Sequence, residues 1–401
     1  MKKMYIKTIL IILTIIGSQV YALTQPCDLK NKPLPNLTTL SALDSQTYYQ
    51  RLDQECKLQK AFIETQNKLS EYEVRPENIT LYQSLRYVER SYYESAKYNN
   101  TPVSLIYQRH KSDYVNAEAQ TQDIWKNWSA GILQLEPNVD RIRQKQKFTL
   151  SDLQQVHRGF YQYDLSTNTF KYSDESGDFS HIPYPGKIKP AYDRDNPWWS
   201  FKTEEERLKN IEIVNSVNSY YKKLGLLSNI ISADPLVNNI FNIKDNSIYS
   251  GDTRANEQHV VDILNMMNTL FEQSHNGQHM IWQNKLFTPA ELAFFVQQFY
   301  VRVHPFFEGN GRTSRFLQEI IMRSFNLPHG SSGDLMNDDV LTEHDQYYQK
   351  AINKTFDLLN EINLCADKVY KEQFKFKFFS KNKDIKKVDQ SQIEYNCQIL
   401  D

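Results

Sequence analysis

Apolar positions in the second half of the chain recur every three or four residues, which is the period of an amphipathic α-helix. The clearest case follows Thr288, which precedes Pro289 and Glu291, so a capping residue, a first-turn proline and a capping-box glutamate occur together. Its apolar stripe consists of Leu292, Phe295, Val296, Phe299 and Val303. The stripe predicts a buried central helix.

Other segments carry the same spacing. We predict helices over residues 40–98, 204–223 and 256–273, and a further helix that Ser151 could cap. Pro137 and the charged residues that follow it predict a break in the helical pattern. The pattern therefore predicts a mainly α fold.

Strand signals are confined to one short stretch. Residues 240–249, IFNIKDNSIY, predict a hairpin with its turn at residues 245–246. Residues 164–199 are rich in Ser, Asp, Gly and Pro, which predicts a long surface excursion or linker. The Lys-rich tail at 368–401, with alternating phenylalanines, predicts a lysine-protected edge strand or a solvated tail; contact with a membrane surface or a partner is the less favoured alternative.

Composition bounds the class of protein. The chain has 401 residues, of which 40% are hydrophobic and 24% charged, which is typical of a globular protein with about two domains. There are 47 Lys and Arg residues and 48 Asp and Glu residues, for a net charge of −1. Nucleic acid is not an expected partner, because its binders usually show a basic excess or patch.

The first 22 residues have the pattern of a secretory signal peptide. Three lysines precede a short apolar core at 9–16, and Val20-Tyr21-Ala22 is a plausible cleavage site. The alternative is an uncleaved anchor, but the apolar core is well short of the roughly 20 residues that span a bilayer. We expect an exported protein with no stable membrane span after cleavage.

Four cysteines follow this segment: Cys27, Cys56, Cys365 and Cys397. In an exported chain an even number permits disulfides, and pairing of sequence neighbours would staple each terminal region. Four free buried thiols are an equally good reading. Their spacing does not suggest a zinc site.

The segment with the most chemical content follows the central helix directly and reads HPFFEGNGRTSR, residues 304–315. Glycines let the backbone approach a ligand closely, and free amides at a helix start bind anions. Arg312 and Arg315 share a helix face and could hold phosphate oxygens. Glu308 is a hard oxygen ligand suited to Mg²⁺, and His304 can take a proton near neutral pH. Together these groups indicate nucleotidyl or phosphoryl transfer.

This segment resembles the signature of the Fic (Fido) family, HxFx(D/E)GNGRxxR. All eight fixed positions match, and a chance match is roughly one in 10¹⁰ per window. They are His304, Phe306, Glu308, Gly309, Asn310, Gly311, Arg312 and Arg315. The residues after the loop predict a second amphipathic helix, whose apolar face is Phe316, Leu317, Ile320 and Ile321. The resemblance covers roughly residues 200–365.

The resemblance implies a helical core that binds ATP with Mg²⁺ and transfers AMP to a Ser, Thr or Tyr hydroxyl of a target protein. His304 would deprotonate that hydroxyl, and Glu308 would hold Mg²⁺. Phe306 would point inward and anchor the loop. A hairpin flap, for which residues 242–250 are the candidate, would align the target by strand pairing.

The remaining signature residues would bind the nucleotide. The amides of residues 309–311 would cradle the α- and β-phosphates, with Asn310 helping to fix the α-phosphate. Arg312 and Arg315 would bind the β/γ end and steady the departing pyrophosphate. These contacts supply the positioning and charge neutralisation that in-line attack needs.

The expected organisation is a signal peptide at 1–22, a mainly helical region of unknown role at 23–199, a Fic-type core with a small hairpin flap at 200–367, and the tail at 368–401. Many Fic proteins carry the inhibitory pattern (S/T)xxxE(G/N). In this chain Glu is followed by Asn or Gly only at Glu77 and Glu308, and neither has Ser or Thr four positions earlier. We therefore expect no self-contained inhibition of that type.

Three alternatives remain open. The donor could be UTP, GTP or a CDP-choline type molecule, because the motif binds a diphosphate and does not recognise the base or the choline. The chain could instead be a pseudoenzyme that serves as a binding module. Glu343-His344-Asp345 has a metal-like composition, but a solvated face of a charged helix is the favoured reading.

ATP is essentially absent outside cells, so an exported ATP-using transferase fits an effector that acts inside a host cell on a host protein.

Overall fold

The computed structural model describes residues 23–35, 42–71, 134–164, 169–170, 199–201, 203–226, 241–244, 247–250, 256–306, 310–328, 330 and 339–379. The predicted signal peptide and the tail beyond residue 379 lie outside these ranges, as do residues 72–133. Within the described part of the chain, no helix is both long enough and apolar enough to cross a membrane.

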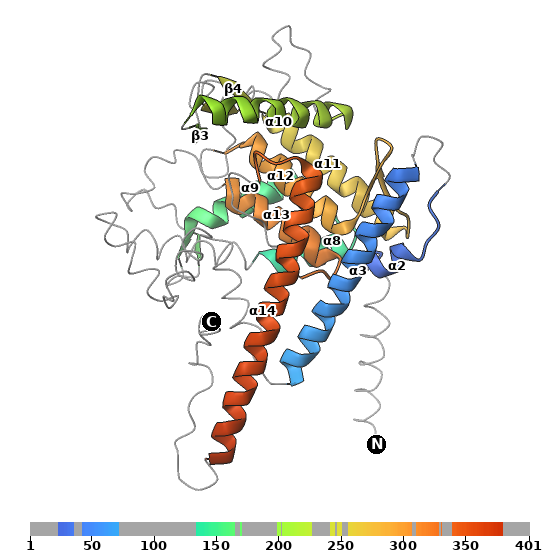
Figure 1. Ribbon diagram of the computed structural model, residues 1–401, viewed down its shortest axis with the longest axis vertical. Helices are drawn as coiled ribbons and strands as arrows, with labels where there is room; N and C mark the ends of the chain where they lie inside the picture. The colour runs from blue at the N-terminus through green and yellow to red at the C-terminus, as the bar shows by residue number, and fades with distance from the viewer. Residues whose placement is uncertain are drawn as a thin grey trace, which may run out of the picture.

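Helix α12 (Pro289–Val303) lies at the centre of the molecule, and all 15 of its residues are buried (Figure 1). It begins where the sequence predicts. The Thr288 hydroxyl accepts a hydrogen bond from the Glu291 N–H, and the Glu291 carboxylate accepts one from the Thr288 N–H. The predicted capping box is therefore confirmed, and the predicted apolar stripe is fully buried.

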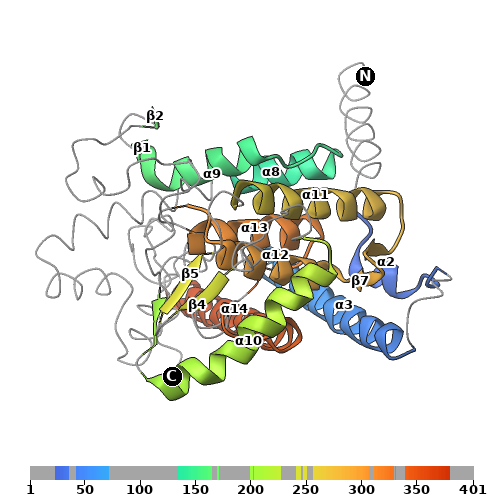
Figure 2. The same ribbon diagram turned by 90° about the horizontal axis from the view of Figure 1, so that it is seen from above.

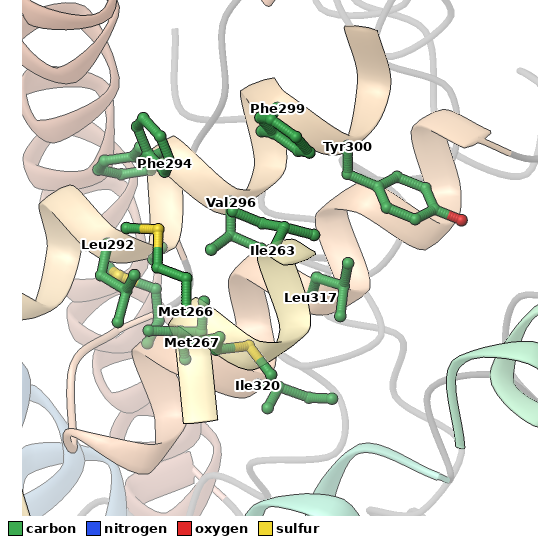
Figure 3. Close-up of a cluster of buried hydrophobic side chains, with 14 of the residues drawn as sticks. Ile263, Met266, Met267, Leu292, Phe294, Val296, Phe299, Tyr300, Leu317 and Ile320 are labelled. Atoms are coloured by element: carbon green, nitrogen blue, oxygen red, sulfur yellow. The ribbon is translucent and has the colours of Figure 1, made fainter. Parts of the chain in front are cut away.

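The helices that pack directly against α12 include α11 (Asn256–His275) and α13 (Asn310–Ser324). Figure 3 shows side chains of all three helices meeting in one cluster. The labelled members are Ile263, Met266, Met267, Leu292, Phe294, Val296, Phe299, Tyr300, Leu317 and Ile320. The apolar face predicted for the second helix is buried here as well.

Helices α8 (Leu135–Arg143) and α9 (Leu150–Gln162) lie over α11 and α13 on one side of this centre (Figure 2). The break predicted at Pro137 is wrong, because Pro137 falls in the first turn of α8, where its missing N–H has no intrahelical partner to lose. Ser151 is not the cap of α9. Thr149 and Asp152 exchange hydrogen bonds there instead.

The opposite side carries α10 (Glu204–Lys223), which has the predicted bounds and has Thr203 as its N-cap. The long helices α3 (Ala42–Glu71) and α14 (His344–Phe379) run side by side away from the centre (Figure 1). Residues 368–379 belong to α14, so the edge strand predicted for this part of the tail is wrong. Their aromatic residues at 370, 374 and 378 also recur every four positions, which suits a helix.

The predicted hairpin is present as β4 (Phe241–Lys244) and β5 (Ser247–Ser250), with Ile243 opposite Ile248. A third strand that the sequence did not predict, β3 (Trp199–Ser200), pairs with the other edge of β5. Strand order is β3-β5-β4, so β4 is an edge strand of this sheet.

Two further strand pairs were not predicted. One joins β1 (Tyr163–Asp164) to β2 (Thr169–Phe170), at the start of the expected linker. The other joins β6 (Met280–Trp282) to β7 (Lys285–Phe287), just before α12. Both residues of the β6–β7 turn, Gln283 and Asn284, have positive φ values, which is the backbone of a tight primed turn.

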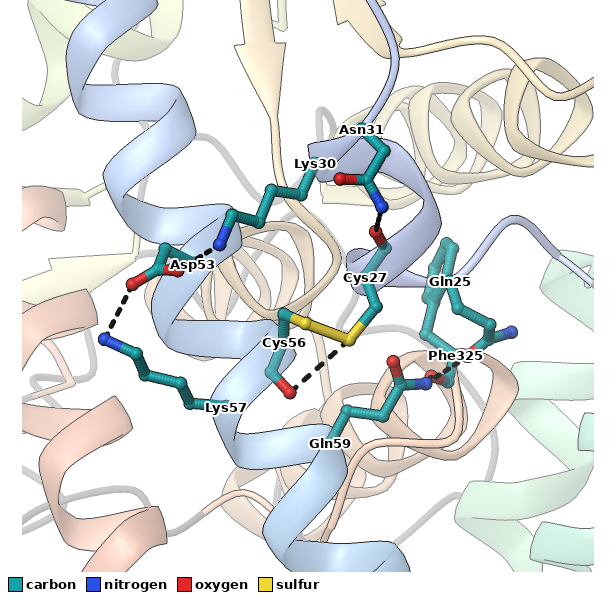
Figure 4. The surroundings of a disulfide bond; sticks show 9 residues. All are labelled: Gln25, Cys27, Lys30, Asn31, Asp53, Cys56, Lys57, Gln59 and Phe325. Atoms are coloured by element: carbon teal, nitrogen blue, oxygen red, sulfur yellow. Dashed lines mark hydrogen bonds and ion pairs between the residues drawn. A yellow bond between two sulfur atoms is a disulfide. The ribbon is translucent and has the colours of Figure 1, made fainter.

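A disulfide joins Cys27 in the short helix α2 (Pro26–Lys30) to Cys56 in α3, which decides the open question for this pair (Figure 4). Cys397 lies outside the described residues, and the Cys365 side chain is not among the described ones. Beside the bridge, Asp53 forms ion pairs with Lys30 and, at 2.7 Å, with Lys57. The bridge therefore fastens the segment before α3 to the middle of that helix.

The start of α12 is tied to α3 by Glu55, which is fully buried. Its carboxylate accepts hydrogen bonds from the Thr288 hydroxyl, from the Ala290 N–H at 3.0 Å and from the Tyr348 hydroxyl at 3.1 Å. An acidic group is favourable at this position because the helix N-terminus carries partial positive charge and unpaired N–H groups. Burial nevertheless raises the pKa of Glu55 to about 7, against the lowering effect of these hydrogen bonds.

A second buried carboxylate, Glu291, lies in the same first turn. Arg51 contacts it at 2.5 Å and Lys285 at 2.6 Å. Burial alone would raise the pKa of Glu291, but these two cations hold it well below its ordinary range. Glu291 is therefore the charged member of the two carboxylates.

We expect Glu55→Gln to change the pH dependence of stability. The raised pKa means that the folded state holds a proton on Glu55 that the unfolded state releases above pH 4.5, so wild-type stability falls as pH rises towards 7. The glutamine cannot titrate. The free energy of unfolding of the variant, measured by denaturant titration and taken relative to wild type, should rise by on the order of 2 kcal/mol between pH 5 and pH 8. A difference that does not change with pH would contradict the assignment.

Candidate functional site

His304 ends α12 in the left-handed conformation, with φ 50° and ψ 53°. This backbone is unfavourable for a residue with a Cβ, and such residues are enriched at functional sites. The imidazole is half-buried, and its Nδ1 lies 3.3 Å from the Val301 carbonyl oxygen. Because a carbonyl can only accept, Nδ1 carries the proton in this contact. In the neutral ring the lone pair is then on Nε2, as a general base requires.

The loop that follows is closed by a reciprocal pair of hydrogen bonds. The Phe306 N–H donates to Asn310 Oδ1 at 2.9 Å, and Asn310 Nδ2 donates to the Phe306 carbonyl oxygen at 2.8 Å. Both residues are buried, with Asn310 only 2% exposed. Asn310 thus holds the loop closed; its predicted contact with an α-phosphate stays a prediction.

Phe306 points into the core, as predicted, and its ring is fully buried. On one side it stacks on the imidazole of His157 from α9, with ring centroids 3.8 Å apart and planes inclined by 27°. On another side lies the Tyr300 ring, at 6.4 Å between centroids. The loop is therefore anchored by a ring that contacts both α12 and α9.

The first turn of α13 follows the loop directly. Asn310 and Gly311 are its first two residues, so the amides at this end have no intrahelical acceptor. The Arg315 guanidinium lies against the glycine: a Cβ built on Gly311 would be 3.3 Å from Arg315 Nη1. A helix start, a residue without a side chain and a guanidinium are thus brought together, which is a suitable arrangement for an anion.

Three predicted groups are not placed. Glu308 and Gly309 lie outside the described residues, and the Arg312 side chain is not described, although its backbone belongs to α13. Among the side chains that the structure describes, no cluster of three His, Cys, Asp or Glu residues could hold a metal ion. The assignment of Glu308 to Mg²⁺ stays a prediction.

The prediction that Glu343-His344-Asp345 is a solvated helix face is confirmed only in part. Glu343 and Asp345 are exposed, but His344 is buried at the start of α14. Its Nδ1 lies 3.0 Å from Gln298 Oε1, and burial lowers its pKa. The three side chains have separate protein partners, which are Ser216 for Glu343, Gln298 for His344 and Arg51 for Asp345.

Two residues that support α12, one at its start and one beside its end, escaped the sequence analysis. Glu55 and His157 lie 233 and 149 positions before their contacts Thr288 and Phe306. No local spacing signals either contact.

The described part of the chain is mainly helical. Its central helix α12 ends at His304, and the next helix, α13, begins at Asn310. A small hairpin, β4–β5, precedes these helices in the sequence. Residues 236–322 match the family described as Fic/DOC, and this range includes the hairpin, α11, α12 and most of α13. This segment is thus similar to a family whose members generally transfer nucleotide-derived groups to proteins.

A crystal structure of a Fic domain-containing signaling protein from Bacteroides thetaiotaomicron is similar to this protein, with 13% sequence identity and a TM-score of 0.35. The likeness covers 78% of this chain and 94% of that one. No curated protein matches the sequence. The assignment of the domain rests on the family match.

We expect Asn310→Ala to destabilise the protein by about 2–4 kcal/mol, because it leaves the N–H and C=O of Phe306 buried without their partner. Denaturant titration measures this loss. The control is Gln349→Ala, which removes an exposed amide hydrogen bond on α14 and should cost about 0.5 kcal/mol or less. Equal losses in the two variants would show that the Asn310 contact does not hold the loop.

Proposed function

We propose that this protein is a protein adenylyltransferase, which transfers AMP from ATP to a Ser, Thr or Tyr hydroxyl of a target protein. The observation that supports the proposal is that Phe306, two residues after His304, is hydrogen-bonded to Asn310, the first residue of α13. The loop between them is held by the Phe306–Asn310 hydrogen bonds. A base and an anion-binding helix end are thereby set at the two ends of one short, closed loop.

In the proposed reaction, Nε2 of His304 takes the proton from the target hydroxyl. The hydroxyl oxygen then forms a bond to the α-phosphorus of ATP, and the bond from that phosphorus to the bridging oxygen of pyrophosphate breaks. The Nδ1 contact with Val301 keeps the lone pair on Nε2. The first amides of α13 and the guanidinium of Arg315 offset the negative charge of the phosphates, and Arg312 is proposed to add to this. Mg²⁺, proposed to be held by Glu308, supplies further charge neutralisation when bound.

The hairpin supports a proposal for the target. An extended segment can extend a sheet only at an edge that still has unpaired backbone groups. Since β5 already pairs with β3 and with β4, the two edge strands of this sheet are β3, which has two residues, and β4, which has four and therefore offers the longer edge. We propose that the target segment bearing the hydroxyl pairs with residues 241–244.

The proposal extends to the place of action. The signal-like sequence at 1–22 suggests export, and the Cys27–Cys56 disulfide is of the kind that forms in oxidising compartments. Because the donor is a nucleotide, we propose that the exported protein acts where ATP is present, inside a host cell and on a host protein.

We expect the purified protein to label itself or a protein in a host-cell lysate when supplied with Mg²⁺ and α-labelled ATP. His304→Asn should abolish labelling while leaving stability almost unchanged, because Asn tolerates the left-handed backbone at this position better than other side chains. Labelling that persists in this variant would remove His304 from the mechanism.

The donor is tested in the same assay by offering UTP, GTP and CDP-choline in competition with ATP and reading the mass added to the target. Transfer of a different group would replace ATP by that donor. If the protein binds ATP but transfers nothing in any lysate, the binding-module alternative replaces the enzymatic one.

Gly311→Ala should weaken nucleotide binding about tenfold without destabilising the protein. The new methyl group would push the Arg315 guanidinium aside by a few tenths of an ångström, whereas alanine is a better helix former than glycine. Arg315→Ala is the reference. If both variants act through the same guanidinium, their effects on the nucleotide dissociation constant are not additive in the double variant. Fully additive effects would place the guanidinium away from the bound nucleotide.

A further inference from the structure

We infer that His157 of α9 is a positioning residue for the transfer reaction, although it lies outside the segment that matches the Fic/DOC family. The inference concerns the proposed function, since it states what keeps His304 in place. Its basis is the stack between the His157 imidazole and the Phe306 ring in the core.

The geometry makes this stack a tight contact. A centroid separation of 3.8 Å with planes inclined by 27° places the two rings almost face to face, at van der Waals distance. His157 is 1% exposed and Phe306 is fully buried, so water does not separate them or replace either ring. A smaller residue at position 157 would leave a cavity on one face of the Phe306 ring.

The position of Phe306 determines that of His304. Only Pro305 separates the two residues, and Pro305 is itself buried with a fixed φ. The backbone of Phe306 is also bonded on both sides to Asn310. A shift of the Phe306 ring into a cavity would therefore move the end of α12 relative to the start of α13. That displacement changes the distance between base and phosphate, on which the rate depends strongly.

The helices α8 and α9, the second of which carries His157, are attached to α11 and α13. The Phe148 backbone exchanges hydrogen bonds of 3.0 and 2.9 Å with the Asn268 side chain of α11. Arg143 donates to the Arg323 carbonyl oxygen, at the end of α13, at 2.6 Å. His157 is thus held by a support fixed to both α11 and α13, which lets one ring set the loop between α12 and α13.

The test uses the full chain with three variants. His157→Ala removes the ring, and His157→Phe keeps a flat ring without the nitrogens. Leu153→Ala is the matched control, because Leu153 is buried one turn earlier on α9 and its truncation destabilises the same helix without removing a ring from Phe306. Thermal stability, kcat and KM for the nucleotide, and amide hydrogen exchange of the peptide containing Phe306 and Asn310 are measured for each.

We expect His157→Ala to lower kcat by at least about tenfold with a smaller change in KM, and to speed exchange in the loop peptide. His157→Phe should restore most of the rate and the protection, and Leu153→Ala should lose stability while keeping kcat. Equal losses of kcat in His157→Ala and Leu153→Ala, or no rescue by phenylalanine, would overturn the inference.

The exchange measurement separates this inference from the proposed function. If wild-type protein transfers nothing, the proposed reaction fails. Faster loop exchange in His157→Ala alone would still show that His157 positions the loop. Unchanged loop exchange would overturn its positioning role, whatever the activity.

Discussion

Complete burial of α12 is the constraint on which the rest of the structure depends. A helix leaves unpaired N–H groups at its start and unpaired carbonyl groups at its end, and a buried helix cannot leave them to bulk water. At the start, Thr288, Glu291 and Glu55 supply acceptors. At the end, the chain turns sharply at His304, whose N–H and Nδ1 both face carbonyls of the last turn. The residue with the proposed chemistry is therefore also the residue that terminates the central helix.

This constraint explains why regions distant in sequence form one core. Leu58 of α3, Leu135 of α8 and Val156 of α9 belong to the same buried cluster as the residues of α11, α12 and α13. Helices before residue 200 supply contacts to both ends of α12. Glu55 of α3 accepts hydrogen bonds at its start, and His157 of α9 packs on Phe306, just after its end. The described parts of the region 23–199 thus support the site directly.

The sequence allowed prediction of features whose signals are local. The bounds of α10 and α12 follow from capping residues a few positions apart, and the hairpin at 241–250 follows from a short alternating pattern. The inward position of Phe306 could be predicted because the residue types of the signature are contiguous. The bond from Glu55 and the stack from His157 could not, since each depends on how helices far apart in sequence pack. The break predicted at Pro137 was wrong for a related reason, because whether a proline breaks or begins a helix depends on its position in that helix.

The Cys27–Cys56 bridge closes a loop with a sequence separation of 29, and a cross-link of that length stabilises a folded chain by about 3–4 kcal/mol in the chain-entropy model. That contribution exists only while the sulfurs stay oxidised, so reduction of the bridge would remove it. Non-covalent attachments would remain: Thr24 bonds Ser274 through both its backbone and its hydroxyl, and Lys32 reaches the Gly277 carbonyl oxygen at 2.6 Å. The segment before α3 thus has a covalent attachment that depends on the redox environment and a polar attachment that does not.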